Sequence, residues 1–170
     1  MKYFTGLWKL REWTDEEGKY IEEAVLLVQH PPKTNLYSSI ALFLNKTTQA
    51  DYVIIGKTLA EDKKLVRTLA MTHGQNVQEN LTYNTANAAC EHVLGHNFVY
   101  FPEKLQELFP LDDFLRDVDV HGYMAVALND REDNTIGLLS LLYKGKIARP
   151  ELAEHLLFMM ASLLEEELNN

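Results

Sequence analysis

One strand of this chain, GYMAVAL at 122–128, is apolar on both of its alternating sets of positions. Tyr123, Ala125 and Ala127 fall on one face, and the residues between them, which are equally apolar, fall on the other. A strand that is apolar on both faces is typically covered on both sides. The polar run 129–134 then predicts a turn to a second apolar strand, so that the segment forms a β-hairpin. Gly137 interrupts this second strand and indicates a bulge or the close approach of another group.

Strands and helices are expected on either side of this hairpin. Runs of β-forming residues predict three further strands, at 51–60, 64–71 and 97–101. Helical spacing and helix-start residues predict two long helices, one from Thr34 or Asn35 to about residue 49 and one from about Pro150 to about residue 168. Short helices are expected over 86–94, 103–109 and 111–118, and a loop over 72–85. This order predicts an α+β fold with a central antiparallel sheet of about five to six strands and helices on both faces.

Two alternatives fit residues 1–30. Thr14 and Glu17 have the spacing of a helix capping box, and apolar residues then recur at helical spacing, which predicts a helix over 15–29. The same stretch also fits a hairpin of strands Phe4–Trp13 and Tyr20–Val28 around a glycine-containing turn. The helix is favoured. Because the prolines at 31 and 32 end any preceding element, we expect an N-terminal extension over 1–30 and a domain over 31–170.

The charge of the chain disfavours two classes of partner. Its 170 residues carry a formal net charge of −9, and the longest basic run is Lys63-Lys64. Binding to nucleic acid or to anionic lipid needs clustered lysine and arginine, so we expect no nucleic-acid partner and no membrane contact. The single cysteine allows no intrachain disulfide, and neither a signal peptide nor a run of about 18 apolar residues is found, which predicts a cytoplasmic protein.

Four segments, read in order over residues 34–168, resemble a GAF domain. ADYVIIGKTL and KKLVRTLAM resemble the first two strands of that family. YNTANAACEHVLG resembles a small-residue run and helix of a signalling branch, and the segment from GYMAVALNDREDNTIGLLSLLY to the helix PELAEHLLFMMASLLEEEL resembles the last hairpin and the terminal helix. The hairpin with its Ile-Gly-Leu-Leu is the most specific part of the resemblance.

The resemblance implies a non-catalytic sensory or regulatory domain of a signal-transduction protein. Such domains bind a small molecule between the sheet and the short helices, which here predicts a pocket over residues 73–123, or act as dimerising relays. The alternative is a structural dimerisation module with a vestigial pocket. The ligand and cofactor stay unknown, because the cyclic-nucleotide signature is missing and Cys90 followed by Glu91 does not match the context of bilin-attaching members. An enzyme of the family, which reduces free methionine sulfoxide, relies on several cysteines, whereas this chain has one.

Five residues are candidates for the wall of the predicted pocket: His73, Cys90, His92, Tyr100 and Tyr123. The tyrosines are chosen because a phenol offers both an aromatic wall and a hydrogen bond. Cys90 and His92 flank Glu91, but successive helical positions point about 100° apart, so these residues cannot all face one pocket. A small core cysteine is therefore the favoured interpretation of Cys90. No catalytic residue is assigned.

Acidic and histidine residues in the same region lack the spacing of a metal site. His92 and His96 are four residues apart, but Gly95 between them is expected to end the helix. No HExxH motif and no Cys/His cluster is present, so no metal site is predicted. The acidic residues around Asp112 and Asp117 are interpreted as a solvated face.

The closing helix carries two apolar stripes. Leu152, Leu156, Met159 and Leu163 form one, which can pack on the sheet, and the other consists of Leu157, Met160, Leu164 and Leu168. The second stripe needs a partner, and a helix of a second subunit would supply it, which predicts a homodimer. The alternative is one wide stripe buried within a single domain.

Overall fold

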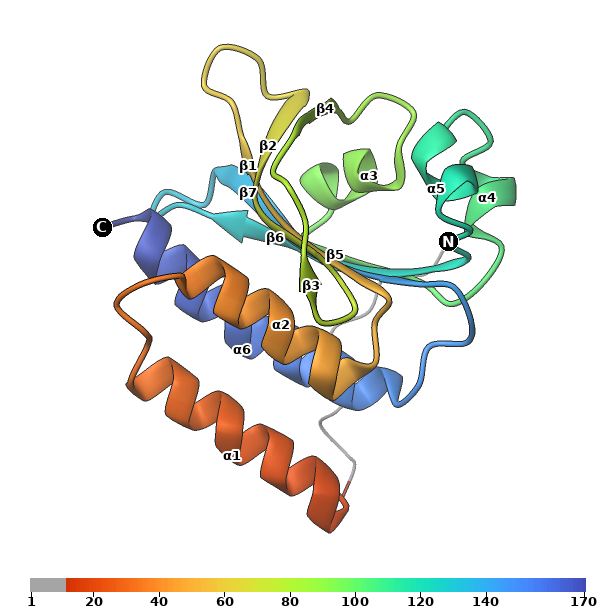
Figure 1. Ribbon diagram of the computed structural model, residues 1–170. Coiled ribbons are helices and arrows are strands. Elements are labelled where there is room, and N and C mark those ends of the chain that lie inside the picture. Colours follow the sequence, from red (N-terminus) through yellow and green to blue (C-terminus); the bar gives the residue numbers. More distant parts are fainter. Residues whose placement is uncertain (1–11) are drawn as a thin grey trace.

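Helices cover both faces of a seven-stranded antiparallel sheet in the computed structural model, which describes residues 12–170 (Figure 1). The elements in chain order are α1 (Asp15–Gln29), α2 (Leu36–Thr48), β1 (Tyr52–Thr58), β2 (Leu65–His73), β3 (Asn76–Val77), β4 (Thr82–Asn84), α3 (Ala89–Gly95), β5 (Phe98–Phe101), α4 (Leu105–Leu108), α5 (Asp113–Asp117), β6 (Gly122–Asn129), β7 (Thr135–Tyr143) and α6 (Pro150–Leu168). The predicted α+β fold is confirmed.

The sheet has the strand order β3-β2-β1-β7-β6-β5, and β4 pairs with the opposite end of β2 from β3. The two short strands β3 and β4 lie in the segment that was predicted as a loop. They contain two and three residues, of which only Tyr83 is not fully exposed, so they carry no apolar alternation that the sequence could reveal.

The predicted hairpin is formed by β6 and β7, and its first strand is buried on both faces from Gly122 to Leu128. Both consequences expected of Gly137 are present. The register shifts beside it, between Leu128 and Asn129, and a Cβ atom at Gly137 would overlap the backbone carbonyl oxygen of Gly56 in β1. Close pairing of β7 with β1 therefore depends on the glycine.

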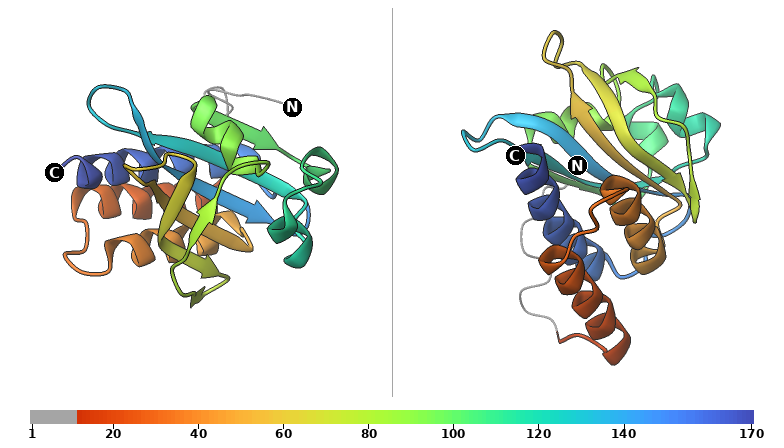
Figure 2. Two further views of the ribbon diagram at one scale, coloured as in Figure 1. Left: turned by 90° about the horizontal axis from the view of Figure 1, so that it is seen from above. Right: turned by 60° about the vertical axis from the view of Figure 1, so that its left-hand side comes forward.

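Side-chain alternation divides the strands between two apolar cores. Val53 and Leu141 belong to the core that the sheet shares with α2 and α6, whereas their neighbours Ile54 and Leu142 face the core under the short helices α3, α4 and α5. Figure 2 shows the long helices on one side of the sheet and the short helices on the other, with α1 outside α6.

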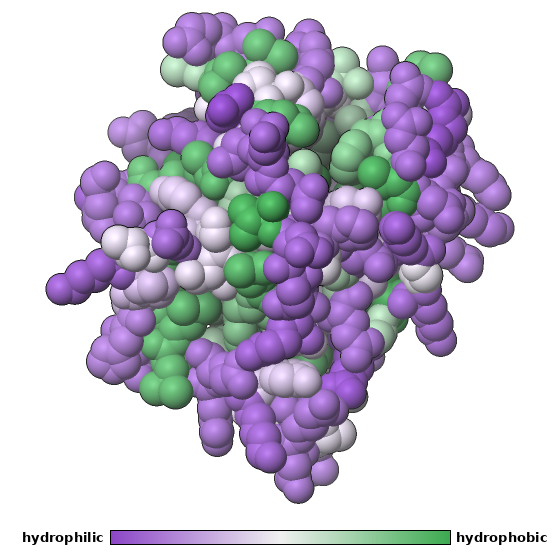
Figure 3. Space-filling model, viewed as in Figure 1, coloured by the Kyte–Doolittle hydropathy of each residue, from purple (hydrophilic) through white to green (hydrophobic). Residues whose placement is uncertain are grey.

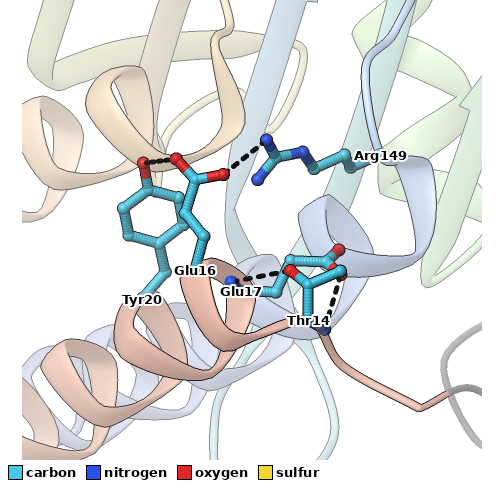
Figure 4. A network of polar contacts seen from close by, with 5 residues as sticks. All are labelled: Thr14, Glu16, Glu17, Tyr20 and Arg149. Atoms are coloured by element: carbon cyan, nitrogen blue, oxygen red, sulfur yellow. Dashed lines mark hydrogen bonds and ion pairs between the residues drawn. The ribbon is translucent and has the colours of Figure 1, made fainter.

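Of the two alternatives for the N-terminal segment, the structure contains the helix. The backbone N–H of Glu17 donates to Thr14 Oγ1 at 3.2 Å and the backbone N–H of Thr14 donates to Glu17 Oε1 at 3.0 Å, which completes the predicted capping box (Figure 4). Glu16 also pairs with Arg149, just before α6, at 2.7 Å. Most of the alternative strand 4–13 lies outside the described residues, and the domain boundary at residue 30 stays a prediction.

The predicted dimer surface on α6 is buried within the chain, partly by α1. Leu157, Met160 and Leu164 are fully buried within the chain, and Leu168 is half-buried. The sheet covers one side of α6, and α1 packs on another, with Trp13 stacked on His155 at 5.5 Å between ring centroids. The second stripe therefore finds its partner in the same chain, and the prediction that these three residues contact a second subunit is wrong.

Candidate functional site

A pocket lies between the sheet and the short helices, within the region predicted to hold one. Its floor consists of side chains that alternate onto the same face of four strands: Ile54 of β1, Met71 of β2, Tyr123 of β6, and Ser140 and Leu142 of β7. Because four strands contribute the five floor residues, the sheet determines the position of the pocket floor.

The short helices and β4 form the remaining walls. Ala88, Ala89 and Cys90 come from the start of α3, Asp112, Phe114 and Leu115 from α5 and its N-cap, and Leu81, Tyr83 and Asn84 from β4 and the residue before it. The cavity measures about 160 Å³. Leu81 and Phe114 are 40% and 37% exposed, and apolar surface is visible between β4 and α5 in the space-filling view (Figure 3). The mouth of the pocket is therefore apolar as well.

Tyr123 places a buried hydroxyl group on the wall of this pocket. The residue is 3% exposed, and its hydroxyl oxygen has no hydrogen-bond partner. The Ser140 side chain on the adjacent strand is near enough to influence the phenol without making a hydrogen bond of normal geometry. Burial raises the pKa of Tyr123 well above its ordinary value, so the phenol is neutral and can donate a proton to a hydrogen bond.

Cys90 and Tyr83 face each other across the same wall. Burial is the main cause that raises the pKa of the Cys90 thiol to about 12, and the carboxylate of Asp112 adds to the effect. Burial, followed by the neighbouring Cys90, raises the pKa of Tyr83 well above its ordinary value. Because the thiolate is the reactive form of cysteine, a protonated Cys90 is a poor nucleophile. Its thiol acts as a small apolar wall group.

Asp112 brings a carboxylate to the pocket and also caps α5. The backbone N–H of Leu115 donates to Asp112 Oδ1 at 3.4 Å, and burial raises the pKa of this carboxyl above its ordinary value. The prediction of a solvated acidic face holds for Asp113 and Asp117, which are exposed, but Asp112 is partly buried.

The structure brings two of the five predicted wall residues together in the pocket, namely Cys90 and Tyr123. His73 instead stacks on Tyr52, with 4.3 Å between ring centroids, and His92 packs edge-on against Phe109 at 5.1 Å. Tyr100 packs on the opposite face of the sheet, with the core of the long helices. Any role of these three residues in ligand binding stays a prediction, and it would have to involve another place than this pocket.

Twelve of the fourteen lining residues were not among the predicted five, and those with a polar side chain are Tyr83, Asn84, Asp112 and Ser140. The sequence does contain a signal for Ser140, because it is the one small polar residue in the apolar run 136–143. Tyr83 lies in the three-residue strand β4, and Asp112 lies in the segment just before α5, so neither belongs to a pattern long enough to predict the direction of its side chain. Among residues 12–170, no group of three or more His, Cys, Asp or Glu side chains has the arrangement of a metal site.

No protein-family model and no curated protein matches the sequence. Solved structures do resemble the fold. The chromophore-binding domain of Stigmatella aurantiaca phytochrome P1 matches with a TM-score of 0.65 and 16% sequence identity, over 91% of this chain and 62% of that one. Bacteriophytochrome RpBphP3 from R. palustris matches with a TM-score of 0.69 and 9% identity, over 93% of this chain and 38% of that one. This chain thus spans less than two thirds of these proteins.

The architecture and its neighbours define the class of fold. Chromophore-binding domains of bacteriophytochromes contain a GAF domain, and this chain superimposes on them over nine tenths of its length. The chain therefore has a GAF-like fold, as the resemblance predicted. In the part of the chain that the structure describes, no helix is both long and apolar enough to span a bilayer.

Proposed function

We propose that this protein is a non-catalytic sensory or regulatory domain that binds a small molecule in the pocket between the sheet and the helices α3 and α5. The observation that carries the proposal is the buried, unpartnered hydroxyl of Tyr123 on the wall of a cavity of about 160 Å³. A buried hydroxyl without a partner costs about 1–3 kcal/mol, which a polar ligand atom would recover. The GAF-like fold supports the proposal, because its structural neighbours include chromophore-binding domains.

The chemistry of the pocket favours binding over catalysis. Cys90 is the one thiol of the chain, and its raised pKa of about 12 keeps it protonated near neutral pH. Tyr83 and Tyr123 are neutral near pH 7 in any case, and burial raises the pKa of both phenols further. These groups can donate hydrogen bonds to a ligand, but they lack the activation that covalent catalysis needs.

A route for a signal runs through β7. Leu142 is a pocket residue, and its neighbour Tyr143 lies on the opposite face, where its hydroxyl donates to the carbonyl oxygen of Thr48 at the end of α2 at 3.1 Å. Met124 of β6 likewise follows Tyr123 and packs in the core of the long helices. A ligand that shifts these strands would thereby shift the packing of α2 and α6.

Methionine methyl groups provide a test on both faces of the sheet. Met71 lies in the pocket, whereas Met124 and Met160 lie in the core of the long helices. The protein labelled with ¹³C at its methionine methyl groups would be titrated by NMR with a panel of small metabolites. Binding predicts a saturable shift of the Met71 signal, and a relay predicts additional shifts of the Met124 and Met160 signals.

A matched pair of alanine substitutions locates the binding site. Ala88→Leu would fill part of the pocket, whereas Ala86→Leu adds the same side chain at an exposed position two residues away, outside the pocket wall. The first variant should lose the ligand-dependent Met71 shift and the second should keep it. If no compound of a broad panel shifts Met71, or if Ala88→Leu binds like the original protein, the proposed function is wrong.

A further inference from the structure

The volume of the pocket limits the size of a ligand. An apolar cavity of about 150 Å³ in another protein holds one benzene molecule, and this one measures about 160 Å³. Pockets for drug-sized ligands are about 300–1,000 Å³. A linear tetrapyrrole has four rings, so most of it would have to lie outside a cavity of this volume. One aromatic ring with a small substituent does fit.

The charge of the pocket limits the ligand further. Asp112 is the one acidic side chain among the residues that form the wall, and there is neither a lysine nor an arginine among them. Its carboxylate is half-buried, so its field is screened less than that of a surface carboxylate. An anionic ligand would meet repulsion from Asp112 without a compensating cation. Phosphate-bearing ligands such as cyclic nucleotides are therefore unsuited to this pocket.

The polar groups of the pocket define what the ligand needs besides a ring. The walls are mostly apolar, with Ile54, Leu115 and Leu142 among them, and they would cover the two faces of a flat ring. The Tyr123 hydroxyl, buried and unpartnered, is positioned to bind one polar atom of the ligand. This ligand atom must be uncharged or positively charged, because the carboxylate of Asp112 lies in the same pocket.

We infer that the pocket takes a small single-ring aromatic molecule that carries one hydrogen-bonding substituent and no negative charge. The inference rests on the proposed function, because it names the ligand class of the same site. It assigns two residues distinct parts in specificity: Tyr123 binds the polar substituent, and Asp112 excludes anions.

Benzamide and benzoate test these two roles, because the compounds have the same ring and nearly the same size but differ in charge. Both would be titrated at millimolar concentrations, with the Met71 methyl signal as the readout. Benzamide should bind at least tenfold more tightly than benzoate. Asp112→Asn should strengthen benzoate binding and so reduce the ratio of the two affinities. Helix α5 should be retained in this variant, because Asn is as good an N-cap residue as Asp. Tyr123→Phe should weaken benzamide binding about three- to tenfold.

The inference is overturned if benzoate binds as tightly as benzamide, if benzamide gives no Met71 shift, or if Asp112→Asn and Tyr123→Phe leave both affinities unchanged. These outcomes differ from failure of the proposed function. If other compounds of the panel shift Met71 and respond to Ala88→Leu, the pocket binds ligands and only their class is wrong. If nothing in the panel shifts Met71, both statements fail.

Discussion

The backbone of Gly56 in β1 occupies the space that a side chain at Gly137 in β7 would need. A Cβ atom at position 137 would overlap the Gly56 carbonyl oxygen, and the obstacle is backbone, which cannot rotate away. The two strands pair next to each other at the centre of the sheet. The contact therefore fixes the distance between β1 and β7, which carry the pocket residues Ile54, Ser140 and Leu142.

Gly137→Ala should consequently destabilise the protein, because β1 and β7 must separate to admit the methyl group. We expect the free energy of unfolding to fall by about 2–3 kcal/mol, as overpacking in a core does. Gly145→Ala is the matched control, since nothing lies within 4 Å of its added Cβ atom, and it should stay within about 0.5 kcal/mol of the original protein. Urea denaturation of both variants measures the difference. Equal stabilities would show that the sheet yields freely at this point.

Two buried tyrosines on opposite faces of the sheet should respond differently to loss of their hydroxyl groups. Tyr143 donates to the Thr48 carbonyl oxygen, so Tyr143→Phe should lower the free energy of unfolding by about 1 kcal/mol. The Tyr123 hydroxyl makes no hydrogen bond of normal geometry, although Ser140 lies close to it, so Tyr123→Phe removes a buried group that is poorly satisfied. It should leave the free protein equally stable, or more stable by up to about 1 kcal/mol.

Denaturation curves of the two variants, recorded without ligand, make this comparison. A loss of more than about 1 kcal/mol in Tyr123→Phe would mean that its hydroxyl already has a partner in the free protein. That result would remove the main support for the pocket as a binding site. A gain in stability together with weaker benzamide binding would identify Tyr123 as a residue retained for function at the expense of stability.

A substitution at Leu157 tests whether α6 is buried within one chain or forms an interface between two chains. Its side chain is fully buried within the chain, so Leu157→Ala should lower the free energy of unfolding by about 2–5 kcal/mol. The molar mass in sedimentation equilibrium should not change at any concentration. Ser162→Ala, at an exposed position of the same helix, should leave both quantities unchanged. A variant at Leu157 that keeps its stability but loses half its mass would restore the dimer interpretation.

The sequence predicted best the features that depend on a long local pattern. The hairpin of β6 and β7 was predictable because the apolar run 122–128 is followed by a polar turn and a second apolar run, and these flanking signals favour two strands. Tyr100 shows the opposite case. β5 has four residues, and only its pairing of Phe101 with Tyr123 determines that Phe101 shares the pocket side and Tyr100 does not. That register is set by pairing between segments that are distant in the sequence, so it cannot be predicted from local periodicity.

The misassigned stripe of α6 has a similar cause. Leu157 and Leu164 were correctly predicted to be apolar positions that need cover, but the sequence did not show what covers them. The cover includes α1, whose own pattern also fitted a strand, and whose fully buried residues are only Glu17 and Ala24. A helix that contributes so few buried side chains is hard to recognise as part of a core before its partner is known.

The thiol of Cys90 should react far more slowly in the folded protein than after denaturation. Burial raises its pKa to about 12, above the ordinary value of 9.0, and only the thiolate is alkylated by iodoacetamide. The alkylation rate of the native protein should therefore keep rising about tenfold per pH unit from about pH 8 to beyond about pH 10, whereas an ordinary thiol levels off near pH 9. Because the chain has one cysteine, the mass of the intact protein reports this reaction alone.

The same shift has a consequence for stability at alkaline pH. Between about pH 9 and about pH 12 the folded protein keeps the Cys90 proton while the unfolded chain loses it, so the folded state binds more protons and its stability falls as the pH rises. Cys90→Ala removes this contribution and should flatten the decline, although the raised pKa values of Tyr83 and Tyr123 leave part of it in place. Urea denaturation of both proteins at about pH 8 and about pH 10 measures the slope. An alkylation rate that levels off near pH 9, or equal slopes in the two proteins, would place the thiol in solvent rather than in the wall of the pocket.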